Sequence, residues 1–599
     1  MKKDSYYLAL SVSHNSSAAL MKNGEILIAV CEERFCREKN YIGYPKQSID
    51  YCLKKANIQG CDIERVAYTT IDNQGILVKA KTNTKFSIKD YHDYYGNNYY
   101  GRKLKGLDVS NYLKWLRDDS KFNSDIEYFD FSYLTDEVIN NSELDIKLFR
   151  DESAKTLATH LGIPIKKIEF LDHHTCHAYY AYFGSPVRDK DCIVLTMDGW
   201  GDGRNQTVWK VSKNRFLLLA SSSQNDIGRI YKLATLLLGM RPDEHEFKVM
   251  GLAPYAKLNY VEKVLHEIEN ICDVKDMKII SKNRPSDLYQ FLKDIFLTHR
   301  FDNIAGAVQL YTEKIACKLV GNIIEKTGIT NFVLGGGIAM NIKMNQAIME
   351  MDSVNNLYVC GSNGDESLSI GGCYLLNENS KYLSSPLNHL YLGYDSIDDM
   401  NSFDIEALSK KFTVKTNVEK AVIAKLLKEG DIVGIIRSKA EFGARALGNR
   451  SILANPSIRE SIQKINEAIK NRDFWMPFAL SILEEKHQEY IENPKNIKSP
   501  LMTISFNAKL DKYRQIEAGT HPYDKTVRPQ FVSKDNAKAY HDLITEFFNI
   551  TGVPALLNTS FNLHGEPIVN TVQDAIRTFE LSGLDHLYIN DKYLISKLR

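Results

Sequence analysis

Apolar and polar positions are grouped along this chain in blocks that predict short strands followed by turns and helices. Residues 7–13 form a short, largely apolar run, and two further apolar runs flank Asn23-Gly24, a dipeptide typical of a tight β-hairpin. Residues 192–197 and 332–335 are strand candidates that end in glycine loops. Strands that end in glycine and aspartate loops before helices indicate an α/β fold with a ligand at the loop ends.

The length of 599 residues exceeds what one hydrophobic core usually supports, so at least two domains are expected. A polar stretch that ends in Pro386 predicts a boundary between residues 1–385 and residues 386–599. Inside the first domain, residues from about 76 to 150 are rich in Tyr, Asn and Lys, which predicts an insertion of loops and short helices. Its tyrosines are candidates to line a substrate cleft, although packing is the simpler role. The second domain is also expected to be α/β, with a closing hairpin at residues 587–595.

Composition narrows the class of protein. Hydrophobic residues make up 44% of the chain and charged residues 25%, as in ordinary globular proteins. The formal net charge of +1 gives no electrostatic reason to expect nucleic acid or a membrane surface as partner. The ten cysteines form no C-x-x-C pair, and neither a signal peptide nor an apolar run of membrane-spanning length is evident. A reduced, cytoplasmic location is therefore expected.

Three of the 15 histidines lie within five positions, in the segment Asp172-His-His-Thr-Cys-His177. Asp172 is a good helix N-cap, and a helix is predicted from His173 to Phe183, before Gly184. Positions four apart share a helix face, so His173 and His177 should point together while the third histidine turns away.

That spacing suits two imidazole ligands of one divalent metal, but two histidines do not close a site. Asp198 and Asp365 lie in glycine-rich loops and are candidates for oxygen ligands. The spacing alone leaves open a capped helix with incidental histidines, and the two acidic loops favour the metal site.

The second domain carries signals for an anion site. Arginines match phosphate geometry, and neighbouring glycines let the backbone come close to a ligand. A run of charges usually marks a solvated surface, but these arginines lie beside glycines and apolar strands, which favours a phosphate pocket. The candidate residues are Arg445, Arg450, Lys470, Arg472, Arg528, Ser560 and Asn562.

Several motifs in fixed order identify a resemblance that covers nearly the whole chain. The chain resembles the O-carbamoyltransferases that modify nodulation factors, cephamycins, aminoglycosides, ansamycins and the saxitoxin group. The motifs are His14-Asn-Ser-Ser-Ala18, Glu32-Glu-Arg-Phe35, the histidine segment, Asp198-Gly-Trp-Gly201, Lys248-Val-Met-Gly-Leu-Ala-Pro-Tyr255, Gly335-Gly-Gly337, Glu441-Phe-Gly443 through Ser451, and Leu557-Asn-Thr-Ser-Phe-Asn562.

This resemblance implies an actin-like ATPase fold for the first domain and a fold like threonylcarbamoyl-AMP synthase for the second. In the family, the second domain joins carbamoyl phosphate and ATP into carbamoyl-adenylate and releases phosphate and pyrophosphate. The first domain then passes the carbamoyl group to a hydroxyl of an acceptor, here expected to be a small-molecule natural product of secondary metabolism. Mg(II) accompanies the ATP.

The resemblance also implies roles for individual residues. His14 becomes a base or orienting group for the acceptor hydroxyl. The implied metal is ferrous iron, and its ligands are His173, His177, Asp198 and Asp365. Residues implied to bind nucleotide or carbamoyl-adenylate in the first domain are Lys248, Gly335, Gly336, Gly337 and Asn341. Residues implied to bind ATP and carbamoyl phosphate in the second domain are Arg445, Arg450, Lys470, Arg472, Arg528, Ser560 and Asn562.

The chain departs locally from the family pattern. Ala444 and Leu480 each stand where proline is usual, and Arg437-Ser-Lys439 replaces a more common Q-G-R. Ala256 stands where the motif ending in Tyr255 is commonly followed by glycine. None of these changes removes an implied ligand, but the shape of the carbamoyl phosphate pocket is affected.

Other classes of protein share some of these features. A hydrogenase-maturation carbamoyltransferase is excluded because that class carries paired C-x-x-C zinc fingers, and this sequence contains no C-x-x-C. A tRNA threonylcarbamoyl-type enzyme is disfavoured by the neutral net charge and by the fused domains. A nucleotide-binding scaffold without catalysis remains an alternative, and a homodimer is compatible with the sequence. The identity of the acceptor is not encoded in any motif.

Overall fold

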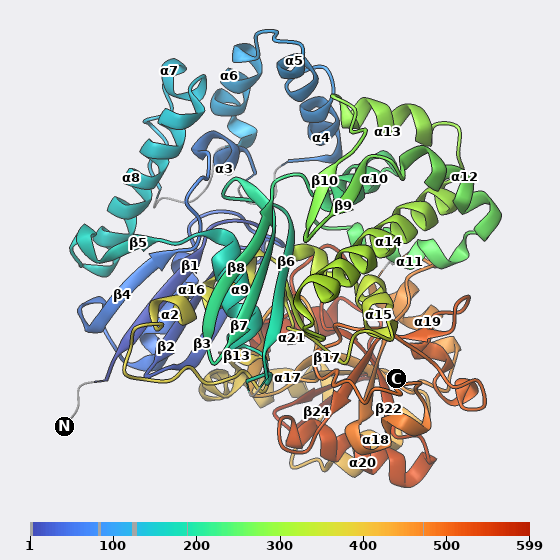
Figure 1. The fold of residues 1–599 in the computed structure, drawn as a ribbon. Coiled ribbons are helices and arrows are strands. Elements are labelled where there is room, and N and C mark those ends of the chain that lie inside the picture. Colours follow the sequence, from blue (N-terminus) through green and yellow to red (C-terminus); the bar gives the residue numbers. More distant parts are fainter. Residues whose placement is uncertain (1–3, 82–85, 123–128, 189, 471–472, 599) are drawn as a thin grey trace. The chain divides into compact units, whose positions relative to one another are not determined.

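The computed structural model describes residues 4–81, 86–122, 129–188, 190–470 and 473–598. The chain forms two compact units, Met1–Pro386 and Leu387–Arg599 (Figure 1). Within the described ranges, no helix combines the length and apolar composition that a bilayer crossing requires. The two units are described separately below.

Two five-stranded sheets with the same strand order form the first unit. In each sheet the first three strands are antiparallel and the last two run parallel to the first. The first sheet has the order β3 (Glu25–Cys31), β2 (Ser17–Lys22), β1 (Tyr6–Ser11), β4 (Ile63–Tyr68), β5 (Ile168–Phe170). The second has the order β8 (Arg215–Ser222), β7 (Arg204–Ser212), β6 (Cys192–Gly201), β11 (Asn331–Gly335), β12 (Asn356–Val359). This repeated topology is that of the two halves of an actin-like ATPase, so the predicted α/β, actin-like fold of the first domain is confirmed.

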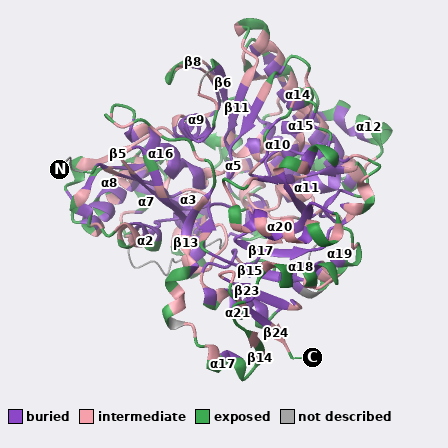
Figure 2. Ribbon diagram, turned by 90° about the horizontal axis from the view of Figure 1, so that it is seen from below, coloured by how far each residue is buried: buried purple, intermediate pink, exposed green. Residues whose placement is uncertain are grey.

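Two helices pack against each other at the centre of this unit. Helix α16 (Leu368–Leu376) covers β1 and β2, whereas α9 (His173–Phe183) covers β6 and β11. Glycine makes the contact between them close, because a Cβ at Gly371 would stand 2.0 Å from the backbone oxygen of Cys176. Both helices are buried along almost their whole length (Figure 2). The histidine segment therefore lies inside the protein.

The remaining helices of the first unit surround this centre. They are α1 (Glu33–Cys36), α2 (Lys46–Ala56), α10 (Ile227–Leu237), α11 (Glu246–Leu252), α12 (Leu258–Ile268), α13 (Leu288–Phe296), α14 (Phe301–Thr327) and α15 (Ile342–Glu350). A small hairpin joins β9 (Cys272–Lys275) and β10 (Lys278–Ser281).

The tyrosine-rich insertion consists mostly of short helices, as its sequence suggests. They are α3 (Gly75–Lys81), α4 (Ile88–Tyr95), α5 (Tyr100–Leu104), α6 (Ser110–Asp118) and α7 (Asp136–Ile139), followed by the longer α8 (Ser142–Leu161). Several of its aromatic side chains pack on one another; the Tyr94 and Tyr99 rings, for example, stack with centroids 4.9 Å apart. In Figure 1, α4 lies beside the helices that follow the second sheet, and α4 contacts α10.

An eight-stranded sheet forms the second unit, which confirms the predicted α/β class of this domain. Its order is β14 (Phe412–Lys415), β24 (Tyr593–Lys597), β23 (His586–Ile589), β15 (Val433–Ile436), β17 (Arg450–Ala454), β22 (Ala555–Ser560), β18 (Ala479–Leu483), β21 (Pro529–Val532). The helices are α17 (Ile405–Ser409), α18 (Lys420–Lys428), α19 (Glu460–Ile465), α20 (Lys538–Thr551) and α21 (Val572–Glu580). Two short pairs join β13 (Tyr391–Asp395) with β16 (Lys439–Glu441) and β19 (Phe506–Asn507) with β20 (Thr526–Val527).

Both hairpins predicted from turn chemistry are present. Asn23 and Gly24 have φ of 51° and 86°, and Asn590 and Asp591 have φ of 48° and 53°, as the tight turns between their strands require. One expectation was wrong. The strand that begins at residue 192 does not end before Asp198 but continues to Gly201, with an irregularity in its pairing to β7.

Candidate functional site

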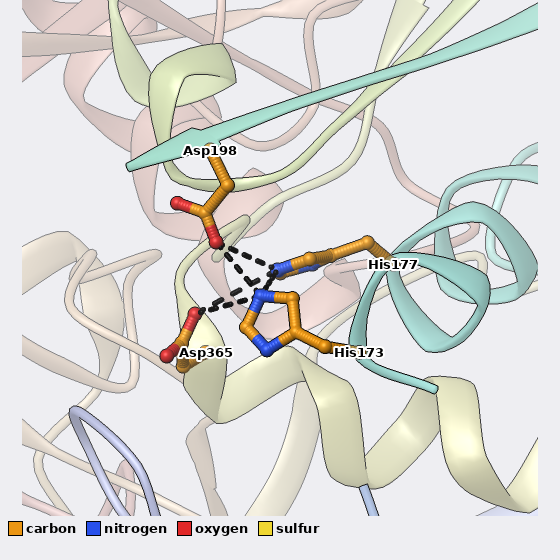
Figure 3. A group of neighbouring side chains, drawn as sticks. All are labelled: His173, His177, Asp198 and Asp365. Carbon is orange, nitrogen blue, oxygen red and sulfur yellow. Dashed lines mark hydrogen bonds and ion pairs between the residues drawn. The ribbon is translucent and has the colours of Figure 1, made fainter. Parts of the chain in front are cut away.

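Four side chains from three segments meet in the first unit (Figure 3). The Nε2 atoms of His173 and His177 are 3.1 Å apart and lie 2.8 Å and 3.3 Å from the same oxygen, Oδ2 of Asp198. Asp365 Oδ1 completes the group, 3.7 Å and 3.6 Å from these two nitrogens. One possible ligand atom from each residue lies within 4.8 Å of every other. The structure thus brings together all four residues predicted to bind the metal.

Helix geometry places the two histidines. Asp172 caps α9 by accepting a hydrogen bond from the Thr175 N–H at 2.8 Å. The third histidine, His174, turns away as predicted, with Nδ1 2.8 Å from Thr196 Oγ1 and Nε2 3.1 Å from the Arg204 carbonyl oxygen. Burial, with a contribution from the neighbouring charge of His173, lowers the pKa of His174 to about 3, so this ring is neutral.

A residue that sequence reasoning did not select fixes the start of this helix. Asp202 accepts a hydrogen bond from the His173 N–H at 2.8 Å through Oδ2. Its other oxygen, Oδ1, accepts from the Thr70 hydroxyl and the Ile71 N–H, both at 2.9 Å. Asp202 therefore ties the histidine helix to the loop after β4. The sequence feature that could have identified Asp202 is its position as the second carboxylate of the segment Asp198-Gly-Trp-Gly-Asp202.

The oxygens of the two carboxylates that point away from the histidines are also held. Asp198 Oδ1 accepts the Gly199 N–H at 2.7 Å, and Asp365 Oδ2 accepts the Ser13 hydroxyl. Such supporting bonds orient metal ligands in known sites. Ser13 was not predicted, and it links the loop after β1 to the four-residue cluster.

The histidines and aspartates of the cluster stabilise one another's charged forms. Burial would keep the histidines neutral, but the carboxylates of Asp365 and Asp198 outweigh it and raise the pKa of His173 to about 9. The pKa of His177 is raised as well, because the same two carboxylates outweigh its burial. Conversely, although burial opposes ionisation, the two imidazoles hold the pKa of Asp198 well below its usual range.

These residues fit a divalent metal. Ligands about 2.1 Å from a four-coordinate ion are separated from each other by about 3.4 Å. The separations of 2.8–3.7 Å between the imidazole nitrogens and the carboxylate oxygens bracket this value. Two imidazoles with two carboxylates suit transition metals such as iron or zinc better than magnesium or calcium.

The glycine loop after β11 packs against this cluster. A Cβ at Gly337 would stand 2.8 Å from Asp198 Oδ1, and one at Gly336, whose φ is 86°, would stand 2.4 Å from the Met197 carbonyl oxygen. A Cβ at Gly335 would stand 3.1 Å from the His177 carbonyl oxygen. All three positions of the triad, for which nucleotide binding was predicted, are adjacent to the cluster, and glycine there allows the close approach.

Two other predicted nucleotide contacts lie nearby in the chain but have different surroundings. The Asn341 side chain caps α15 by accepting the Met344 N–H at 2.9 Å, and it exchanges two hydrogen bonds with Gln309. The Asn341 amide thus holds α15 against α14, and one of its two amide N–H donors makes the bond to Gln309. Lys248 lies on α11 and is half-buried.

His14 follows Ser13 directly, so it lies next to the residue that holds Asp365. The His14 side chain is half-buried. Burial raises the pKa of the Asp243 carboxyl, but Lys232, Lys81 and, to a smaller extent, His14 outweigh it and lower this pKa. His14 therefore lies near Asp243 and follows the residue that bonds to Asp365.

In the second unit, strand register brings segments that carry predicted anion-binding residues to the same end of neighbouring strands. β17 begins and β22 finishes at this end, since Ser451 pairs with Ser560. β18 begins there too, because Ala479 pairs with Asn558, and β21 begins beside it. The predicted residues at these four strand ends are Arg445, Arg450, Arg528, Ser560 and Asn562. Lys470 lies on the segment before β18, and Arg472 falls outside the described residues.

One member of that group has a structural role. Arg450 is fully buried and donates five hydrogen bonds to backbone oxygens, so no guanidinium N–H remains for a phosphate. The prediction that Arg450 binds phosphate directly is wrong for this reason. The acceptors are the carbonyls of Asn570, Arg437, Asn449, Tyr394 and Ser438.

The loop that carries Arg445 is shaped by a buried carboxylate. Glu441 Oε1 accepts the N–H groups of Leu447, Asn449 and Arg450 at 2.7, 2.8 and 3.1 Å. Arg445 itself is half-buried on this loop. The equivalent turn after β22 is held by Ser560, which donates to Asn562 Oδ1 at 2.7 Å.

Comparison with known proteins decides the family. Residues 7–374 match the family Carbamoyltransferase N-terminus, and residues 424–597 match Carbamoyltransferase C-terminus. The chain belongs to the carbamoyltransferase family. It is accordingly a carbamoyltransferase enzyme, as its motifs predict, and its family implies carbamoyl phosphate and an acceptor as substrates.

Relatives of this carbamoyltransferase extend over its full length. Uncharacterized protein MJ1051 of Methanocaldococcus jannaschii is 30% identical, covering 99% of this chain and 100% of the relative. Nodulation protein NolNO of Sinorhizobium fredii is 29% identical, covering 98% of this chain and 79% of the relative. Among solved structures, HypF of T. kodakarensis matches 64% of this chain and 49% of that chain at 11% identity, with a TM-score of 0.31.

Proposed function

We propose that this carbamoyltransferase is ATP-dependent, that its second unit makes carbamoyl-adenylate from carbamoyl phosphate and ATP, and that its first unit transfers the carbamoyl group to a hydroxyl of a small molecule. The observation that carries the adenylation step is the gathering of Arg445, Arg528 and Ser560 at the ends of neighbouring strands. The motifs of the chain support the same division of labour.

The basic residues of the second unit suit the binding of two anionic substrates. Carbamoyl phosphate and ATP are both anions and repel each other, so a site that joins them needs fixed positive charge. Arg445 and Arg528 precede strands β17 and β21, and Lys470 and Arg472 are proposed from the sequence to add positive charge. Backbone and hydroxyl donors from the turns held by Glu441 and Ser560 add neutral hydrogen bonds. Mg(II) is proposed to enter with ATP.

In the first unit, His173, His177, Asp198 and Asp365 would hold a divalent metal, for which we propose ferrous iron. When bound, such an ion supplies positive charge that can stabilise the phosphate of carbamoyl-adenylate. The glycine loop of Gly335, Gly336 and Gly337 packs against this cluster, and we propose that its backbone contacts the adenylate together with Lys248.

His14 is proposed to orient the acceptor hydroxyl and accept its proton. A hydroxyl is a weak nucleophile, and a positioned imidazole removes its proton as the new bond forms. The bond from Ser13 to Asp365 supports this placement, because it fixes the neighbouring residue at the edge of the cluster.

The test measures the first half-reaction by itself. The purified protein is supplied with ATP and carbamoyl phosphate without an acceptor, and pyrophosphate release is followed. We expect release that depends on both substrates, because adenylation precedes transfer. Protein that releases no pyrophosphate under these conditions would show that activation does not proceed through carbamoyl-adenylate.

A further inference from the structure

A second group of charged side chains in the first unit lies outside the metal-type cluster. It is formed by Lys81 at the end of α3, Lys232 on α10 and Asp243 in the loop before α11. Lys232 Nζ is 2.6 Å from Asp243 Oδ2, and the Tyr91 hydroxyl donates to the same oxygen at 3.2 Å. Lys232 and Asp243 keep 21% and 31% of their side-chain surface exposed, so a ligand can reach them.

In the described part of the chain, the second lysine, Lys81, has no counterion of its own. Among the described residues, Lys81 Nζ makes no hydrogen bond or ion pair. It lies over the rings of Tyr91 and Tyr94, 5.9 Å and 5.8 Å from their centroids. Lys232 Nζ lies over the same Tyr91 ring at 5.7 Å. Two ammonium groups therefore share one carboxylate, and the ring faces neutralise only part of the charge.

Without a bound anion, these two neighbouring positive charges are unfavourable. Burial and the nearby charge of Lys232 lower the pKa of Lys81 to about 8. The next carboxylate, Glu246, compensates incompletely, since burial and the charge of Asp243 raise its pKa to about 7. An ammonium kept beside a second ammonium, without a carboxylate of its own, is stabilised when an anion binds.

The group is also close to the residue proposed to act on the acceptor. Although burial opposes ionisation of Asp243, the charges of Lys232, Lys81 and His14 together hold the pKa of this carboxyl below its usual range. The two lysines and His14 therefore all lie near this one carboxylate. A molecule seated on the lysines would bring its own hydroxyls toward His14, and the tyrosines of α4 would flank it.

We propose that Lys81 and Lys232 form the subsite for an anionic group of the acceptor. The proposal rests on the function proposed above and narrows it: the acceptor is a hydroxylated small molecule that carries a carboxylate or a phosphate, such as a uronic acid or a sugar phosphate.

The first test compares binding of matched probes by titration calorimetry. D-glucuronate and D-glucose 6-phosphate are each compared with D-glucose, which separates the carboxylate and phosphate forms of the proposal. We expect the anionic sugars to bind more tightly than glucose to the unaltered protein. Lys81→Gln should weaken their binding about tenfold and leave that of glucose unchanged, because it removes one charge-assisted contact.

Two further variants separate charge from fold. Lys81→Arg keeps the positive charge and should keep the preference for the anion. Lys263→Gln is the matched control, because Lys263 lies over the ring of Tyr260 at 5.5 Å on the exposed surface of α12, and it should change nothing. Equal binding of the charged and neutral sugars, or a preference that survives Lys81→Gln, would overturn the proposal.

The same preparations are assayed for pyrophosphate release without an acceptor and for sugar carbamoylation by mass spectrometry. Lys81→Gln should leave pyrophosphate release unchanged while the KM for an anionic acceptor rises about tenfold. Absence of pyrophosphate release in every preparation refutes the proposed adenylation, whereas the binding comparison tests the anion subsite independently. Release that falls in Lys81→Gln would argue against an acceptor subsite.

Discussion

Gly201 lies directly against the imidazole of His173: a Cβ at position 201 would stand 2.2 Å from Cδ2 of that ring. The last residue of β6 therefore sets how far His173 can move, although it carries no ligand. Gly201→Ala should displace the ring and reduce the metal content of the purified protein by more than half, since ligand geometry must be held closely. Elemental analysis measures the metal content.

Gly199 offers the matched control in the same segment. A Cβ there would meet no atom within 4 Å, and the substitution retains the N–H that holds Asp198. Gly199→Ala should keep its metal. Equal metal content in Gly199→Ala and Gly201→Ala would show that the contact with His173 is not restrictive.

The metal assignment itself predicts a loss of binding when both imidazoles are removed. Protein purified without chelator should contain about one equivalent of a divalent transition metal, and His173→Ala/His177→Ala should contain almost none. His266→Ala, an exposed histidine on α12, serves as the control. Metal retained by the double variant would place the ion elsewhere.

His14 should separate the two half-reactions. His14→Asn removes the proposed base, so acceptor carbamoylation should fall by a factor on the order of 10²–10⁴. Pyrophosphate release without acceptor should stay close to that of the unaltered protein, because adenylation is assigned to the second unit. A parallel fall of both activities would identify His14 as a structural residue.

Arg445, on the loop before β17, and Arg450, the first residue of β17, should behave differently. Arg450→Lys leaves several buried carbonyls without donors, and the free energy of unfolding should fall by on the order of 3 kcal/mol. Arg445→Gln should change stability by about 1 kcal/mol or less but lower pyrophosphate release about tenfold or more. Urea denaturation and the pyrophosphate assay distinguish them, and a stable, inactive Arg450→Lys protein would contradict the structural role.

Asp145 predicts a pH dependence of stability. This buried carboxylate on α8 accepts the N–H groups of Gly75 and Ile76, yet burial outweighs them and raises its pKa to about 6. Because the folded state holds the proton more tightly than the unfolded state, this group favours folding at low pH. Its contribution is lost as pH rises from about 4 to about 6, and amounts to on the order of 2–3 kcal/mol.

Asp145→Asn should remove this dependence. The difference in unfolding free energy between Asp145→Asn and the unaltered protein is measured by urea denaturation at several pH values. We expect it to shift in favour of the variant between pH 4 and pH 6 and to be constant above that range. A difference that is independent of pH would show that burial does not control this carboxyl.

The sequence alone determined the elements whose cause is local. The turns at Asn23-Gly24 and Asn590-Asp591 need residues that tolerate positive φ, and helix α9 follows from its cap at Asp172 and the spacing of its histidines. The family, and with it the actin-like fold of the first unit, could be read from ordered motifs because these residues stand at fixed places along the chain.

Only the tertiary structure decided which of the predicted arginines holds the backbone in place. Arg445 and Arg450 look alike in sequence, but Arg450 meets five carbonyls from four segments that are far apart in the chain. Likewise, the contacts of Ser13 with Asp365 and of Thr70 with Asp202 join distant segments. No local pattern encodes such pairings, because they arise from the packing of whole sheets and helices, which fixes where each side chain ends.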